Sequence, residues 1–117
     1  MHLIIDGRAN GKKLESRGLI YDILESCPNM IGMTKIAPPY VFRYVGIKPK
    51  DWGITGIVLI AESHIAIHTY PEHGSVNIDV FSCKGFDAES AVKYFKEALG
   101  LTSYERIFLD RGIKEDI

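Results

Sequence analysis

Residues 61–83 read AESHIAIHTYPEHGSVNIDVFSC, and this stretch determines the fold of the chain. Its first part, residues 64–69, and its last part, residues 76–83, are rich in β-branched and aromatic side chains at alternating positions. The connection at 70–75 contains the proline and glycine of a hairpin. The sequence therefore predicts two antiparallel strands joined by a tight connection.

The same stretch carries more chemistry than a strand usually holds. Glu62, Ser63, His64 and His68 are titratable or nucleophilic, although a buried strand normally excludes polar side chains because they lose hydrogen bonds to water. Strand alternation places Ser63 on the face opposite to His64 and His68. We therefore expect a bend or bulge at Glu62–Ser63, which would expose the Glu62 carbonyl and could store backbone strain.

Alternation in the second strand divides its side chains in the same way. Asn77, Asp79, Phe81 and Cys83 share one face, and the residues between them share the other. Cys83 is thus expected on the more polar face of the sheet.

Outward from this hairpin, the pattern predicts a strand at 2–6, a turn at 6–11 and an amphipathic helix that ends near Pro28. Residues 33–47 read as one or two strands broken at 37–39, and 48–51 as a loop. Residues 54–60 are apolar apart from Thr55, as in a strand covered on both faces. Asp87 is a candidate N-cap and Gly100 a candidate C-terminal residue of a second amphipathic helix, and a last strand is expected at 106–109.

This order of elements predicts an α+β fold, a two-layer sandwich of mostly antiparallel β-sheet packed against two helices in a single domain, 1–117. Fourteen basic and fifteen acidic residues give a net charge of −1, which argues against a nucleic-acid partner. We find no membrane-length apolar run and no signal peptide, and therefore expect a cytoplasmic protein. The two cysteines, Cys27 and Cys83, are too few for a disulfide framework.

Residues 53–83, and above all Glu62-Ser63-His64, His68 and the segment Asp79-Val80-Phe81-Ser82-Cys83, resemble the short prokaryotic form of the pyruvoyl-dependent S-adenosylmethionine decarboxylases. The resemblance implies self-cleavage between Glu62 and Ser63, giving residues 1–62 and 63–117. It also implies that Ser63 becomes a covalent pyruvoyl group, which forms a Schiff base with the substrate and accepts electrons as CO₂ leaves. It implies neither a metal nor pyridoxal phosphate, and we find no glycine-rich phosphate loop beside a suitable lysine.

The remaining site residues follow from the same resemblance. His68 matches the histidine that accepts a proton during processing, and Cys83 matches the proton donor in catalysis. Thr55 stands where relatives have a serine that supports processing, and Glu72 matches an acid that binds ribose hydroxyls. The substrate ring or sulfonium would be met by an aromatic side chain, and the candidates are Trp52, Tyr70, Tyr40, Phe42 and Tyr44.

Each assignment competes with an ordinary structural role. Glu-Ser also occurs at 15–16, 25–26 and 89–90, so only the extended match supports Ser63 as a nucleophile. His64 is expected to be structural and His73 to be a solvated loop residue, and the histidine and cysteine spacing does not fit zinc. Glu72 could be an exposed turn carboxylate, and the aromatics could be core residues.

The resemblance is poor over residues 12–52, where relatives have a different loop before the motif. Three functions therefore remain open. The first is an S-adenosylmethionine decarboxylase that serves spermidine and other polyamine synthesis, and the second is a pyruvoyl decarboxylase of arginine or ornithine, for which Arg43 could bind a carboxylate. The third is an unprocessed, non-catalytic binding or regulatory subunit. Besides a small-molecule substrate, the resemblance implies a homodimer whose sheets meet and whose active sites use both subunits.

Overall fold

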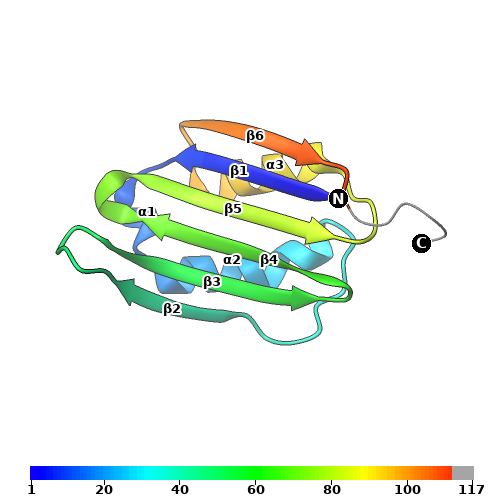
Figure 1. Cartoon of the computed structure of the whole chain (residues 1–117), viewed down its shortest axis with the longest axis horizontal. Helices are drawn as coiled ribbons and strands as arrows, with labels where there is room; N and C mark the ends of the chain where they lie inside the picture. Colours follow the sequence, from blue (N-terminus) through cyan, green and yellow to red (C-terminus); the bar gives the residue numbers. More distant parts are fainter. Residues whose placement is uncertain (112–117) are drawn as a thin grey trace.

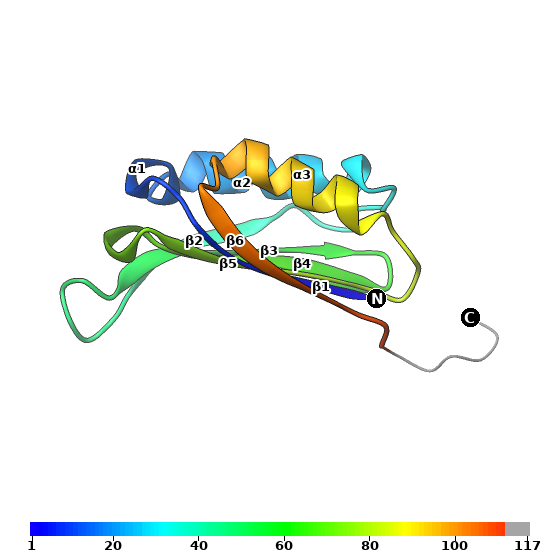
Figure 2. The same ribbon diagram turned by 90° about the horizontal axis from the view of Figure 1, so that it is seen from above.

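The computed structural model describes residues 1–111, which form one six-stranded antiparallel sheet with three helices on one side of it (Figures 1 and 2). The strand order is β2-β3-β4-β5-β1-β6. The strands are β1 (His2–Arg8), β2 (Tyr40–Val45), β3 (Trp52–Ile60), β4 (Ser63–Tyr70), β5 (Ser75–Ser82) and β6 (Ser103–Leu109). The helices are α1 (Gly11–Leu14), α2 (Arg17–Met30) and α3 (Ala88–Leu99), with a 3-10 turn η1 (Pro71–His73) between β4 and β5. The predicted α+β two-layer fold is confirmed, with one short helix more than expected.

The strands β4 and β5 pair antiparallel, as the sequence predicts, and the structure places this hairpin at the centre of the sheet. Its register pairs Ile65 with Val80 and Ile67 with Ile78, and all four side chains are buried under the helices. β1 continues the same pattern, since Ile5 lies opposite Ile78. Alternating strand positions therefore form one layer of the core.

The two long helices supply the other layer of the core. The buried positions of α2 follow the spacing of an amphipathic helix, and Ser16 caps its first turn by accepting a hydrogen bond from the Leu19 N–H at 3.1 Å. Asp87 caps α3, and Gly100 ends it in the left-handed conformation. The buried helical side chains are Ile20, Ile23, Leu24, Cys27, Ala91, Val92, Phe95 and Leu99.

Three boundaries differ from the sequence prediction. β1 extends through Arg8, so the expected turn at 6–11 begins later. Helix α2 passes through Pro28 and ends at Met30, because the proline lies in the last turn and the Cys27 and Pro28 carbonyls accept hydrogen bonds from Ile31 and Met33. The last strand begins at Ser103 and not at 106.

The second face of the sheet carries no helix of the described residues (Figure 2). We call it the open face. The strand register places three rows of side chains on the open face. The first row is Thr55, His68, Asn77 and Asp6, and the second is Ile57, Ala66, Asp79 and Ile4. The third row is Leu59, His64, Phe81 and His2. The expectation that residues 54–60 are covered on both faces is therefore wrong for the single chain, since α2 covers only one side.

Candidate functional site

A two-residue turn, Ala61–Glu62, joins β3 to β4 and places the Glu62–Ser63 bond at one end of the sheet (Figure 1). Glu62 has φ 68° and is the only non-glycine residue with positive φ among residues 1–111. A side chain in this left-handed region costs about 1 kcal/mol or more, which is why glycine or asparagine usually occupies it. The expected break is thus a tight turn and not a bulge, and Ser63 stays in register opposite Ile60.

The chain before β2 holds this turn from the side. The Ala61 N–H donates to the Thr34 carbonyl at 2.8 Å, and the Ile36 N–H donates to the Leu59 carbonyl at 3.0 Å. Lys35 forms an isolated antiparallel bridge with Ile60 and an ion pair with Glu25 of α2. The backbone around the Glu62–Ser63 bond is therefore fixed by backbone hydrogen bonds on both sides.

Ser63 points to the helix-covered side of the sheet, in the row of Ile60 and Ser82. Its Oγ is buried and has no hydrogen-bond partner within the described part of the chain. The Ser82 Oγ, by contrast, accepts from the Lys84 N–H at 3.1 Å and lies 3.5 Å from the Met33 sulfur. An unpartnered buried hydroxyl loses no hydrogen bond when it turns toward a neighbouring carbonyl.

Cys83 follows the last residue of β5 and is exposed at the same end of the sheet as Ser63. We call this the serine end, defined by Glu62, Ser63 and Cys83. Cys27 differs sharply, because it lies on the buried face of α2 and burial raises the pKa of its thiol to about 12. Only Cys83 is therefore available for proton transfer or reaction at the surface.

His68 lies on the open face directly opposite Thr55. The Thr55 Oγ1 and the His68 Nδ1 are 3.4 Å apart, which is a long hydrogen bond. The structure therefore brings together the two residues to which the sequence assigns roles in processing.

Glu72 and Trp52 also meet at this end of the sheet. The Trp52 Nε1–H donates to the Glu72 Oε1 at 3.3 Å, and the Arg43 guanidinium lies 4.6 Å from the centre of the Trp52 ring. Tyr70 precedes η1 and is partly exposed. We call this group the histidine end, defined by Thr55, His68 and Glu72.

The serine end and the histidine end are far apart within one chain. Ser63 and His68 are five residues apart on β4, so their Cα atoms are separated by roughly 17 Å at the rise of a strand. Their side chains also point to opposite faces, as the alternation predicted. The structure does not bring Ser63, His68 and Cys83 into one site within a single protomer.

A polar cluster that the sequence analysis missed lies on the open face near the serine end. The His2 Nε2 is 2.9 Å from the Asp79 Oδ1, and the Arg111 Nη1 is 3.0 Å from the His2 Nδ1. The Arg111 guanidinium also lies over the Phe81 ring, 4.2 Å from its centre. The centres of the His64 and Phe81 rings are 5.9 Å apart. Only the pairing of β1 with β5 reveals this cluster, because its members are far apart in sequence.

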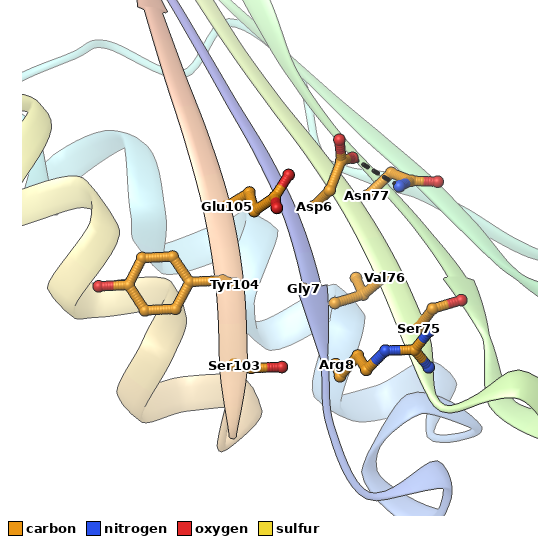
Figure 3. A pocket seen from close by; sticks show the side chains of 9 residues that line it. All are labelled: Asp6, Gly7, Arg8, Ser75, Val76, Asn77, Ser103, Tyr104 and Glu105. Atoms are coloured by element: carbon orange, nitrogen blue, oxygen red, sulfur yellow. Dashed lines mark hydrogen bonds between the residues drawn. The ribbon is translucent and has the colours of Figure 1, made fainter.

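A shallow hollow of about 410 Å³ lies over β5, β1 and β6 (Figure 3). The Asn77 Nδ2 donates to the Asp6 Oδ1 there at 2.7 Å, while Tyr104 points toward the helical side. The complete lining is Asp6, Gly7, Arg8, Ser75, Val76, Asn77, Ser103, Tyr104 and Glu105. None of the predicted site residues lines this hollow.

Within 1–111, no group of three or more histidine, cysteine, aspartate or glutamate side chains is arranged to hold a metal ion. None of the helices in that range has the length and apolar character needed to cross a membrane.

Comparison with known proteins places this geometry in context. Residues 1–112 match the family model described as S-adenosylmethionine decarboxylase. An S-adenosylmethionine decarboxylase proenzyme of Archaeoglobus fulgidus is 54% identical over 95 residues, which cover 80% of each chain. One of Hydrogenobaculum is 46% identical over 118 residues, covering 99% of this chain and 84% of that protein.

Other relatives align over a shorter stretch, and a solved structure aligns over nearly the whole chain. The proenzyme of Geobacillus kaustophilus is 47% identical over 62 residues, or 53% of this chain and 50% of that protein. The crystal structure of the adenosylmethionine decarboxylase from Aquifex aeolicus superposes with a TM-score of 0.80 at 31% identity, covering 99% of this chain and 92% of that one.

Proposed function

Because this chain belongs to the S-adenosylmethionine decarboxylase family, a family of carboxy-lyases, we propose that it is a self-processing, pyruvoyl-dependent S-adenosylmethionine decarboxylase. Its product would be the aminopropyl donor for spermidine synthesis. The observation that carries the proposal is the Glu62–Ser63 turn, where a strained backbone precedes a buried, unpartnered hydroxyl. Both features suit conversion of Ser63 into the pyruvoyl group.

Self-cleavage begins at the turn. The Ser63 Oγ attacks the Glu62 carbonyl carbon, the amide C–N bond breaks, and the hydroxyl proton passes to the released amine, which leaves an ester. A base then removes the Cα proton of Ser63, and Glu62 departs as a carboxylate. Tautomerisation and hydrolysis of the new N-terminus release ammonia and leave the keto group. The left-handed conformation of Glu62 favours the first step because cleavage relieves it.

Decarboxylation follows at the same end of the sheet. A pyruvoyl group at residue 63 would supply a keto carbonyl able to condense with an amine and to withdraw the electrons left by CO₂. Cys83 is exposed at the same end of the sheet and would return a proton to the substrate carbon. Cys83→Ala should therefore be cleaved normally but release product poorly, and unchanged turnover would remove Cys83 as the donor.

His68 provides the base for processing, with Thr55 holding its Nδ1. Glu72 takes the ribose hydroxyls, and Trp52 and Tyr70 present rings to the adenine or the sulfonium. Trp52 supports this role because its Nε1–H already orients the Glu72 carboxylate. Since these residues lie far from Ser63 within one chain, a complete site needs a second protomer to contribute them.

A homodimer supplies that second protomer. If two protomers pack their open faces together and one is turned end for end, the histidine end of each lies over the serine end of the other. The open face supports this arrangement, because it carries exposed apolar side chains, including Tyr40, Phe42 and Leu59, with no helix of the described residues over them. We therefore propose two active sites per dimer, each built from both protomers.

The first experiment measures the intact mass of the denatured protein and CO₂ release from S-adenosylmethionine, ornithine and arginine, with Ser63→Ala as the control. We expect fragments 1–62 and 63–117 with a blocked second N-terminus, CO₂ from S-adenosylmethionine alone, and an uncut control. Release from arginine or ornithine instead would establish the alternative substrate. A single uncut, inactive wild-type chain would indicate a non-catalytic subunit and overturn the proposal.

The second experiment tests whether active sites are shared between protomers. Ser63→Ala and His68→Ala should each remain uncut when expressed alone. When they are co-expressed with different mass tags, the His68→Ala chain should be cleaved, because the open-face side of its Glu62–Ser63 turn would lie against the intact His68 of a partner. Failure of cleavage in verified mixed dimers would rule out His68 acting across the interface.

A further inference from the structure

At the histidine end, the Thr69 side chain forms a hydrogen bond between β3 and β4. The regular ladder runs from Ile60 and Ser63 to Thr55 and His68. Beyond that pair, the Ile54 N–H donates to the Thr69 Oγ1 at 3.0 Å, and the Thr69 hydroxyl donates to the Leu14 carbonyl of α1 at 2.7 Å. Thr69 is 2% exposed, so both hydrogen bonds are shielded from water.

We propose that Thr69 is a positioning residue for self-cleavage, whose hydroxyl sets the His68 imidazole against Thr55. This inference rests on the proposed processing role of His68. Thr69 follows His68 on β4, and Ile54 precedes Thr55 on β3, so one hydroxyl joins the chain neighbours of both members of the pair. Its second bond, to Leu14, fixes the pair to the helical layer.

The backbone at this point shows why a side chain is needed. A Cβ on Gly53 would lie 1.8 Å from the Thr69 carbonyl oxygen, so the two strands approach closely here and only glycine fits. The Thr69 hydroxyl both donates and accepts, which satisfies the Leu14 carbonyl and the Ile54 N–H together. Valine has the same shape but neither capacity, so it would leave two buried backbone groups unpaired.

The side chains of Thr69 and His68 point to opposite faces of β4, so Thr69 does not touch the reacting atoms. Its effect reaches His68 through the backbone of β4 and reaches Thr55 through Ile54. The Thr55 to His68 distance of 3.4 Å is at the long end for a hydrogen bond, so a small shift of either strand breaks it.

The test compares Thr69→Val with Thr69→Ser, which keeps the hydroxyl, and with the matched control Thr102→Val. Thr102 also donates to a backbone carbonyl, that of Arg8 at 3.3 Å, but on the exposed surface away from His68. Proenzymes made in a short cell-free synthesis are followed by mass for loss of the intact chain. Turnover is then measured per mole of cleaved chain, and the thermal midpoint is recorded.

We expect Thr69→Val to slow cleavage by at least about tenfold, since a displacement of about one ångström at a reacting group can cost roughly a hundredfold. The cleavage rate of Thr69→Ser should be within about twofold of the wild-type rate, because serine keeps the hydroxyl that binds Ile54 and Leu14. Turnover per cleaved Thr69→Val chain should fall much less than its cleavage rate, and Thr102→Val should match wild type in both. A simple loss of stability would lower cleavage, turnover and thermal midpoint together.

Cleavage of Thr69→Val at the wild-type rate overturns the proposal, as does a parallel fall of cleavage, turnover and thermal midpoint in this variant. If Thr69→Val does not fold, Thr69→Ser and Thr69→Cys replace it, because a thiol is the weaker donor. Equal cleavage rates of these two variants would then overturn the proposal. An uncut wild-type chain would refute the proposed function itself, which is a different outcome.

Discussion

At the scale of single residues, the chemistry depends on conformations that the residue types do not reveal. Glu-Ser occurs four times in the chain, but only Glu62–Ser63 combines a left-handed first residue with a buried, unpartnered serine hydroxyl. The tight turn causes the first feature, and the position of Ser63 over the helical layer causes the second. What distinguishes this bond is therefore its place in the fold.

We predict that relieving the turn strain slows self-cleavage. Glu62→Gly removes both strain and carboxylate, whereas Glu62→Gln removes the charge and keeps a side chain at φ 68°. If about 1 kcal/mol of strain is released in the rate-limiting step, the glycine variant should cleave about fivefold more slowly than the glutamine variant. Mass-resolved time courses measure both rates, and equal rates would show that the strain does not contribute.

The two cysteines should differ strongly in reactivity. Burial raises the pKa of Cys27 to about 12, so almost none of it is thiolate at pH 8, while Cys83 is exposed. We predict that iodoacetamide at pH 8 modifies the native Ser63→Ala protein once, at Cys83, and twice after denaturation. Peptide mapping identifies the site, and native labelling of Cys27 would contradict the burial.

At the scale of elements, the ends of the helices are set by local hydrogen bonds that the sequence indicates well. Asp87 accepts from the Glu89 and Ser90 N–H groups and from the Ser90 hydroxyl, and Gly100 ends α3 with φ 66°. Sequence analysis predicts both ends because the capping residues act within one turn. Helix α2 ends near Pro28, as predicted, but continues to Met30 because the proline lies in its last turn.

The Asp87 cap should make stability depend on pH. Hydrogen bonds from Ser90, first from its side chain, lower the pKa of Asp87 in the folded protein. Its contribution is therefore present above the unfolded pKa and is lost as the pH falls through the lower folded pKa. We predict that Asp87→Ala lowers the thermal midpoint by a few degrees at pH 7, with the difference from wild type shrinking in acid. A difference that grows in acid would refute the assignment.

At the scale of the whole molecule, one face of the sheet carries the helices and the other carries His68, Phe81 and the exposed apolar side chains of β2 and β3. The proposed site becomes complete only when a second protomer covers this face. The arrangement explains why Ser63 and His68 lie at separate ends of β4 in each chain.

A charge in the open face should therefore weaken both association and processing. Leu59 is 39% exposed on that face and lies opposite His64. The substitution Leu59→Lys would bury a charged ammonium group at the proposed interface. We predict that Leu59→Lys sediments as a monomer and remains mostly uncut, with its helical circular dichroism retained. The control is Lys93→Glu on α3, which lies on the outer helical surface and should behave as wild type. A dimeric, cleaved Leu59→Lys protein would exclude the open face as the interface.

Sequence patterns alone predict the α+β fold, the antiparallel hairpin, the alternation that separates Ser63 from His68, and the family resemblance. These follow from local periodicity, capping and a contiguous motif, which all act over a few residues. The tertiary structure alone decided that only one face of the sheet is covered and that Glu62 is left-handed. It also decided that Thr69 joins α1, β3 and β4 and that His2 meets Asp79. These features depend on strand register and layer packing, which bring together residues far apart in the chain, such as His2 and Asp79 at a separation of 77 positions.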